Sequence, residues 1–274
     1  MEGILRAIVL GIVQGLSEFL PISSSGHLIV VRDLFDWQFT DNLTFDVALH
    51  VGTTVAVLAY FWREWLSMFR SALRWITGDR EHPVGQVYTH RTFLLIALGS
   101  VPIALLGAAF ESEIEDKLRD PIVVGSLLIA FSAVLLGADR FGRGHRSLHE
   151  ATWLDALFIG GSQAIALAPG VSRSGITISA GLFRHFNRQD AARYSFLLST
   201  PAIGGAALLK FTEAASDGTL NDDVGQLLFG ALSAAVVGWL SIAFLMRLVR
   251  STSFAPFVVY RVLAGAFIVA YFAL

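Results

Sequence analysis

This chain lacks cysteine and has few charged residues. With no cysteine among 274 residues, it has no disulfide, no cysteine-bound iron–sulfur cluster and no thiol nucleophile. Only 15% of the residues are charged and the formal net charge is −2, so nothing indicates a basic surface for nucleic acid. The first residues also lack the pattern of a cleaved secretory signal. We therefore expect Gly3 to Leu20 to belong to the mature fold.

Apolar residues dominate the composition instead. Hydrophobic residues make up 54% of the chain, and the mean hydropathy is +0.63. A soluble domain needs more polar surface than this composition leaves. Because helices satisfy their backbone hydrogen bonds internally in lipid, the composition predicts an all-α, polytopic integral membrane protein.

Six apolar segments approach the roughly 20 residues that cross a bilayer. They cover residues 43–62, 91–110, 121–138, 190–210, 224–246 and 257–274. Two further apolar runs, 3–20 and 153–168, stop at Pro21 and Pro169, and a short second helix is expected after each. We expect six transmembrane helices and two re-entrant helical hairpins.

The distribution of arginine predicts how these segments are oriented, because short basic loops stay in the cytoplasm. The basic connections cover 63–91, 140–146, 184–193 and 247–250, whereas 33–46 and 211–223 lack Lys and Arg and 111–120 is mainly acidic. This pattern puts both termini outside and inserts the two hairpins from opposite sides. Residues 1–138 and 153–274 of the single membrane domain 1–274 therefore read as an inverted-topology repeat.

A hydroxyl-rich turn follows each of the two prolines. The turns are SSSG at residues 23–26 and SRSG at residues 172–175. Free N–H groups and the positive dipole end of a half-helix gather at such a turn, so two of them together predict an anion site. Arg173 adds a planar cation that can clasp two phosphate oxygens. The residues expected to bind phosphate or diphosphate are Ser24, Ser25, Gly26, Ser172, Arg173, Ser174 and Thr177.

A carboxylate and an imidazole lie beside the first turn. Glu18 and Gln14 are four residues apart and project from one helical face. A carboxylate next to a phosphate site predicts a divalent cation, because Mg²⁺ takes one or two carboxylates together with substrate oxygens. His27 is suited to move a proton or to attack phosphorus. His50, four residues after Asp46, is expected only behind the groups that touch the ligand.

Two signatures in these stretches resemble the bacitracin-resistance family of undecaprenyl-diphosphate phosphatases. Residues 14–27 (QGLSEFLPISSSGH) match [E/Q]-x-x-x-E followed by Pro-x-Ser-Ser-[Ser/Thr]-Gly-His, and residues 169–177 (PGVSRSGIT) match Pro-Gly-x-Ser-Arg-Ser-x-x-Thr. The resemblance covers essentially the whole chain. It implies dephosphorylation of undecaprenyl diphosphate at the outer face of the cytoplasmic membrane, recycling of this peptidoglycan carrier lipid, and dependence on Mg²⁺ or another divalent cation such as Ca²⁺.

By matching position, the resemblance implies catalytic roles for Glu18, His27, Ser24 and Arg173, with a cation held by Glu18 and Gln14. Many family members carry Glu where this chain has Gln14. Because Gln lacks the charge, we expect Gln14 to orient water or metal rather than to act as a base. The nucleophile stays open between His27, Ser24 and an activated water, with His27 slightly favoured. The oligomeric state is open too, with a homodimer as one alternative.

Two other classes of protein share parts of this pattern. Type 2 phosphatidic-acid phosphatases also carry a Ser-Gly-His turn, but this chain has no Arg-Pro pair, and Ser179 stands where their second motif has His. A transporter or flippase of polyprenyl phosphates also uses inverted repeats with broken helices aimed at an anion. Glu18 and His27 beside the anion site favour chemistry over transport alone. A phosphatase that also moves its product stays an alternative.

Overall fold

The computed structural model describes the chain except for residues 38–41, 79–87, 143 and 218–223. Within the described residues every secondary-structure element is a helix, and the one β-type contact is an isolated bridge between Arg146 and Phe186. This confirms the all-α class. The elements are α1 (Glu2–Phe19), α2 (Ser24–Phe35), α3 (Asn42–Tyr60), α4 (Trp62–Ile76), α5 (His90–Leu118), α6 (Pro121–Phe141), η1 (Leu148–Glu150), α7 (Trp153–Ile165), α8 (Arg173–Phe183), α9 (Arg188–Asp217), α10 (Val224–Leu248) and α11 (Ala255–Phe272).

All six segments predicted to span the membrane form helices, namely α3, α5, α6, α9, α10 and α11. Four of them are long and apolar enough to cross a bilayer: α5 over His90–Phe110, α6, α10 and α11. A fifth candidate is the pair formed by α3 and α4, which is bent by 74°. The helix α9 is not among these candidates, so its crossing stays a prediction. The apolar helices agree with a polytopic membrane protein.

The helix α4 was not predicted, because residues 63–91 were interpreted as a basic connection. Apolar residues recur there at helical spacing, but three arginines and a glutamate interrupt them within WREWLSMFRSALRWI. A search for apolar runs therefore passes over this segment. Arg80 of the same connection and Arg143 of the next lie outside the described residues, as do residues 38–41 and 218–223 of the predicted outer loops.

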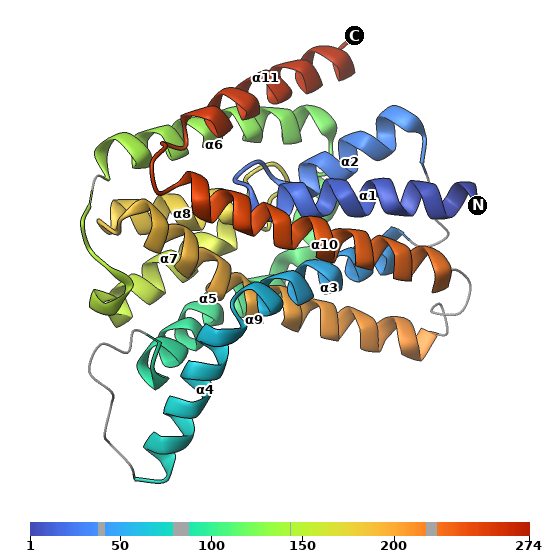
Figure 1. Cartoon of the computed structure of the whole chain (residues 1–274). Coiled ribbons are helices and arrows are strands. Elements are labelled where there is room, and N and C mark those ends of the chain that lie inside the picture. The colour runs from blue at the N-terminus through green and yellow to red at the C-terminus, as the bar shows by residue number, and fades with distance from the viewer. Residues whose placement is uncertain (38–41, 79–87, 143, 218–223) are drawn as a thin grey trace.

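The two predicted hairpins are present as α1–α2 and α7–α8, and each break contains its proline, although α7 already ends at Ile165. The residue before each second helix has almost the same unusual backbone, with φ of 75° at Ser23 and 74° at Ser172. Positive φ is uncommon for a residue with a side chain. The two breaks lie side by side near the middle of the molecule (Figure 1), where the Gly170 backbone N–H donates to Ser23 Oγ at 3.1 Å.

Small residues let α1 approach α10 closely. A Cβ atom added to Gly15 would lie 2.7 Å from the backbone nitrogen of Gly238, and one added to Gly11 would overlap the carbonyl of Gly230. The Gly11-x-x-x-Gly15 pair thus allows close helix packing. In the other half, α7 packs along α5, where a Cβ atom added to Gly160 would overlap the backbone of Gly99.

These helix pairs bear on the predicted repeat. If residues 1–138 and 153–274 are two copies of one unit, α1 corresponds to α7 and α10 corresponds to α5. Exchanging the two halves then turns the contact between α1 and α10 into the contact between α7 and α5. The contacts of α3 with α9 and of α6 with α11 are unchanged by the exchange. The inverted repeat stays a prediction, which this pairing supports.

The second hairpin is enclosed more deeply than the first. Every residue of α8 from Ser174 to Leu182 is buried, whereas α2 leaves Ser25, Asp33 and Phe35 exposed. The N-terminus of α8 is therefore held rigidly, while the N-terminus of α2 borders an open space.

Candidate active site

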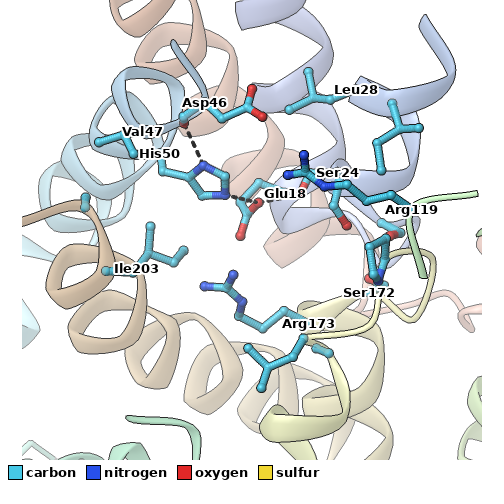
Figure 2. A pocket seen from close by; sticks show the side chains of 18 of the residues that line it. Glu18, Ser24, Leu28, Asp46, Val47, His50, Arg119, Ser172, Arg173 and Ile203 are labelled. Carbon is cyan, nitrogen blue, oxygen red and sulfur yellow. Dashed lines mark hydrogen bonds and ion pairs between the residues drawn. The ribbon is translucent and has the colours of Figure 1, made fainter. Parts of the chain in front are cut away.

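A pocket of about 380 Å³ lies where the two helix breaks meet α3 and α9. Figure 2 shows Glu18, His50 and Arg173 pointing into it from three different helices. Its polar lining consists of Glu18, Ser23, Ser24, Ser25, Arg32, Asp33, Asp46, His50, Arg119, Ser172 and Arg173. Leu28, Ile29, Val47, Leu167, Ile203 and Ala207 add an apolar wall. The pocket thus has a charged, polar part and an apolar part.

The carboxylate of Glu18 is the buried acid of this pocket, with a residue exposure of 6%. Its Oε2 atom accepts a hydrogen bond from Ser24 Oγ at 2.5 Å and another from Gln14 Nε2 at 3.1 Å. A serine hydroxyl that donates to a buried carboxylate has the geometry of a nucleophile beside its base. The structure therefore brings together three of the residues predicted around the first break.

The same corner fits a divalent cation. Gln14 is fully buried, and its Oε1 atom has no hydrogen-bond partner among the described residues. Amide and carboxylate oxygens are the ligands that hard cations prefer. Within the described part of the chain no three His, Asp or Glu side chains form a complete metal site. A cation here would need substrate oxygens or water, as is usual for Mg²⁺.

Arg173 begins α8 and enters the pocket opposite Glu18 (Figure 2). Ser172 caps this helix, because its Oγ accepts from the Gly175 N–H at 3.1 Å. The Arg173 Nε atom is buried and has no hydrogen-bond partner among the described residues. A guanidinium at a helix N-terminus offers both a cation and the positive end of the helix dipole to an anion.

His50 lines the pocket directly, although the sequence placed it behind the ligand-contacting groups. Its Nδ1 lies 2.7 Å from the backbone carbonyl oxygen of Asp46, and its Nε2 lies 3.8 Å from Glu18 Oε2. The Asp46 carboxylate accepts from Arg32 Nη1 at 2.9 Å. These contacts fix the ring so that Nε2 faces the pocket (Figure 2).

His27 lies outside the pocket lining. Its Nδ1 is 2.7 Å from the Ser23 carbonyl oxygen and its Nε2 is 2.6 Å from the Tyr260 hydroxyl. The ring also stacks on Tyr260 of α11, with the two centroids 5.6 Å apart. Because both ring nitrogens have partners and the ring does not line the pocket, the geometry does not support the favoured prediction that His27 attacks phosphorus.

The remaining predicted residues divide between the pocket and the joint between the hairpins. Ser25 lines the pocket and is exposed. Ser174 Oγ instead donates to the Leu20 carbonyl at 3.0 Å, and Thr177 Oγ1 donates to the Arg173 carbonyl at 2.7 Å. Gly26 packs against α6, where an added Cβ would lie 2.9 Å from Val124. These last three residues support the site's framework and do not line the pocket.

Arg261, which the sequence reading passed over, joins the two helix breaks. It is fully buried in α11. Its guanidinium donates to the carbonyls of Pro21 at 3.1 Å, Gly170 at 3.1 Å and Val171 at 3.0 Å, and its Nε donates to Leu128 at 3.2 Å. The available signal was an arginine inside the last apolar span, since charges within spans are usually functional.

Relatives of this chain carry one shared name. The sequence model of the family described as bacitracin resistance protein BacA matches residues 7–267. The Undecaprenyl-diphosphatase of Pelotomaculum thermopropionicum is 45% identical over 262 residues, which cover 96% of this chain and 94% of that protein. The proteins of the same name from Moorella thermoacetica and Geobacter sulfurreducens are 45% and 46% identical over 269 residues, and each alignment covers 98% of both chains.

The resemblance read from the two signatures is therefore confirmed across nearly the whole length. The family match and these identities show that this chain belongs to the family of the bacitracin resistance protein BacA.

Proposed function

We propose that this chain hydrolyses undecaprenyl diphosphate to undecaprenyl phosphate and inorganic phosphate. The observation that carries the proposal is the Ser24 hydroxyl, which donates at 2.5 Å to the buried Glu18 carboxylate in a pocket that also contains Arg173. The name Undecaprenyl-diphosphatase, which the relatives share, supports the same substrate and reaction.

In the proposed reaction Arg173 and the N-terminus of α8 bind the diphosphate and neutralise its charge. Ser24 Oγ attacks the terminal phosphorus, its proton passes to Glu18, and the bond from phosphorus to the leaving undecaprenyl phosphate breaks. Water then attacks the phosphoserine, Glu18 returns the transferred proton to Ser24 Oγ as the bond from phosphorus to Oγ breaks, and the proton of the water leaves with the phosphate. Inorganic phosphate leaves, so the carboxylate acts as base and acid in turn.

Glu18 and Gln14 would hold the divalent cation, Mg²⁺ or Ca²⁺. One carboxylate oxygen of Glu18 accepts from Ser24, which leaves the other for the cation beside the unpaired Gln14 Oε1. A bound cation supplies neutralisation of the phosphate oxygens during transfer. His50 Nε2 faces the same space and is placed to contact a phosphate oxygen.

The apolar wall of the pocket suits the start of a prenyl tail. Leu28 and Ile29 of α2 and Ile203 of α9 line one side of it. Apolar surface there gains free energy by contact with hydrocarbon rather than water. The lipid thus lies with its diphosphate at the helix breaks and its tail toward the bilayer.

The predicted orientation assigns the first hairpin to the outer side of the cytoplasmic membrane, with both termini outside. Dephosphorylation at that face would return the carrier lipid to peptidoglycan synthesis. It also accounts for the bacitracin resistance in the family's description. The hydrogen bond from Ser24 to the buried Glu18 carboxylate favours hydrolysis over a transporter or flippase that acts alone.

Phosphate release from undecaprenyl diphosphate by the detergent-purified protein tests this proposal. Release should require the divalent cation, stop with EDTA, and fall to background in Arg173→Ala and Glu18→Ala. Ser126→Ala, whose hydroxyl bonds its own helix at the Ile122 carbonyl, should behave as wild type. Absence of release, combined with transport of prenyl phosphates into liposomes, would favour the flippase instead.

A further inference from the structure

The helix α4 stands apart from the helical bundle and has no part in the proposed reaction. It follows the apolar helix α3 after a bend of 74° at Phe61. Figure 1 shows it leaving the body of the molecule where α3 ends. If α3 crosses the bilayer, as the sequence predicts, a helix bent by 74° from it runs close to the membrane plane.

Four large apolar side chains of α4 form one face that the protein does not cover. Trp62, Phe69, Leu73 and Ile76 are 54%, 60%, 47% and 73% exposed. At 3.6 residues per turn they fall within a sector about 60° wide. So much apolar surface on one helix, continuous with an apolar span, indicates contact with hydrocarbon rather than water.

Three arginines form a second face immediately beside it. Arg63, Arg70 and Arg74 fall within a sector about 40° wide, and all are exposed. They line a groove of about 420 Å³ together with Trp62, Leu66, Ser67 and Ser71. Among the described residues no carboxylate forms an ion pair with any of the three. Guanidinium groups in a row are suited to bind phosphate oxygens in pairs.

The remaining face of α4 fixes the helix to the protein. Met68 and Ser71 are buried, the His90 backbone N–H donates to Ser71 Oγ at 3.0 Å, and Ser67 Oγ donates to the Tyr88 carbonyl at 2.8 Å. These contacts with the start of α5 determine how α4 is rotated. The apolar face and the arginine face are thereby both directed away from the bundle.

We propose that α4 is an interfacial helix that binds the headgroups of anionic phospholipids. Its apolar face inserts among the acyl chains, and Arg63, Arg70 and Arg74 contact the lipid phosphates at headgroup level. The occupant is a lipid because the arginine groove borders an exposed apolar face, a combination that a free anion does not need. The predicted orientation assigns α4 to the cytoplasmic leaflet, where anionic lipids attract basic segments.

Native mass spectrometry of the full-length protein, titrated with phosphatidylglycerol or phosphatidylcholine, tests the site. The variant R63Q/R70Q/R74Q should lose affinity for phosphatidylglycerol on the order of a hundredfold, given the usual attraction per arginine. The control R140Q/R247Q/R250Q removes equal charge from exposed positions outside α4 and should keep the wild-type preference. R63K/R70K/R74K retains the charge and should keep most of the preference for phosphatidylglycerol.

Three results would overturn the proposal. They are equal loss in both glutamine variants, full retention in R63Q/R70Q/R74Q, or displacement of phosphatidylglycerol by millimolar inorganic phosphate, which would indicate a free-anion site. The depth of α4 gives an independent check, because the chain has no native cysteine. A fluorophore on Leu73→Cys should be quenched by brominated acyl chains. Quenching only by aqueous iodide would contradict insertion.

Discussion

The carboxylate of Glu18 organises the site at the scale of single residues. It accepts from Ser24 and Gln14, and His50 lies 3.8 Å away. A charged group buried among such donors is strongly oriented, since each lost hydrogen bond would leave it incompletely solvated. Ser24 is thereby held at the base that would activate it.

Gln14 gives a direct test of the cation. Gln14→Glu should lower the concentration of Mg²⁺ needed for half-maximal phosphate release, because a second carboxylate beside Glu18 attracts the cation more strongly. The measurement is a titration of activity with Mg²⁺ at saturating substrate. Gln163→Glu, the corresponding glutamine in the second hairpin, is the matched control. An unchanged Mg²⁺ requirement in Gln14→Glu would argue against a cation at this corner.

The contact between His27 and Tyr260 predicts a role in holding α2 against α11. Tyr260→Phe keeps the stacked ring but removes the hydroxyl that lies 2.6 Å from His27 Nε2. We expect a loss of about 1 kcal/mol in stability, the usual contribution of one hydrogen bond, with kcat nearly unchanged. Thermal unfolding and steady-state kinetics measure the two effects. A large fall in kcat at unchanged stability would return His27 to the chemistry.

The local sequence located some of these residues better than others. Glu18, Ser24 and Arg173 could be predicted because each adjoins a proline break in an apolar helix, which is a local signal. The direction of the His27 ring could not, because it depends on Tyr260, 233 positions later in the chain. The sequence predicted His50 behind the groups that contact the ligand for the same reason, because only folding brings α3 beside the end of α1.

At the scale of helices, the site depends on two broken hairpins held at a fixed separation. Arg261 of α11 donates to carbonyls in both breaks, and Ser23 and Ser174 add one hydrogen bond each between them. Backbone carbonyls at breaks in apolar helices each need a partner, because lipid supplies no hydrogen bonds to them. A single guanidinium thus donates hydrogen bonds to carbonyls of both breaks and fixes the distance between them.

Arg261→Met should therefore lower stability and activity together. It removes the guanidinium donor from four carbonyl groups, three of them in the helix breaks, so a loss of roughly 3 kcal/mol or more is expected. Arg261→Lys keeps the charge but lacks the planar fork, and should recover only part of the loss. Thermal unfolding in detergent and phosphate release measure both effects. Wild-type stability in Arg261→Met would remove this arginine from the account.

Hydrophobic patterning predicted the apolar helices and both hairpins but missed α4. Long apolar runs are visible in sequence because lipid demands them. The pattern of α4 is mixed, since it has one face for hydrocarbon and one for headgroups, and its average composition resembles a loop. The role of Arg261 was also hidden, because its four carbonyl partners come from three distant segments.

At the scale of the whole molecule, the pairing of helices across the two halves supports two inverted copies around one pocket. The pairs α1·α10 and α5·α7 exchange under that relation, and Ser23 and Ser172 share one backbone conformation. Sequence similarity between the halves is weak beyond the two turns, so loop charge and helix order carried the prediction.

The orientation can be tested by labelling, because the chain has no native cysteine. Leu274→Cys, at the exposed C-terminus, should react with a membrane-impermeant maleimide in intact cells. Arg250→Cys, in a predicted cytoplasmic connection, should react only after lysis. The reverse pattern would invert the topology and place the pocket at the opposite face.

The most direct measurement compares two neighbouring hydroxyls of one turn. Ser24 and Ser25 both line the pocket, but only the Ser24 hydroxyl donates to Glu18. Phosphate release from undecaprenyl diphosphate should fall by about a thousandfold or more in Ser24→Ala, as expected when a nucleophile is removed, and far less in Ser25→Ala. Equal rates for the two variants, or near wild-type release by Ser24→Ala, would contradict the serine–carboxylate mechanism.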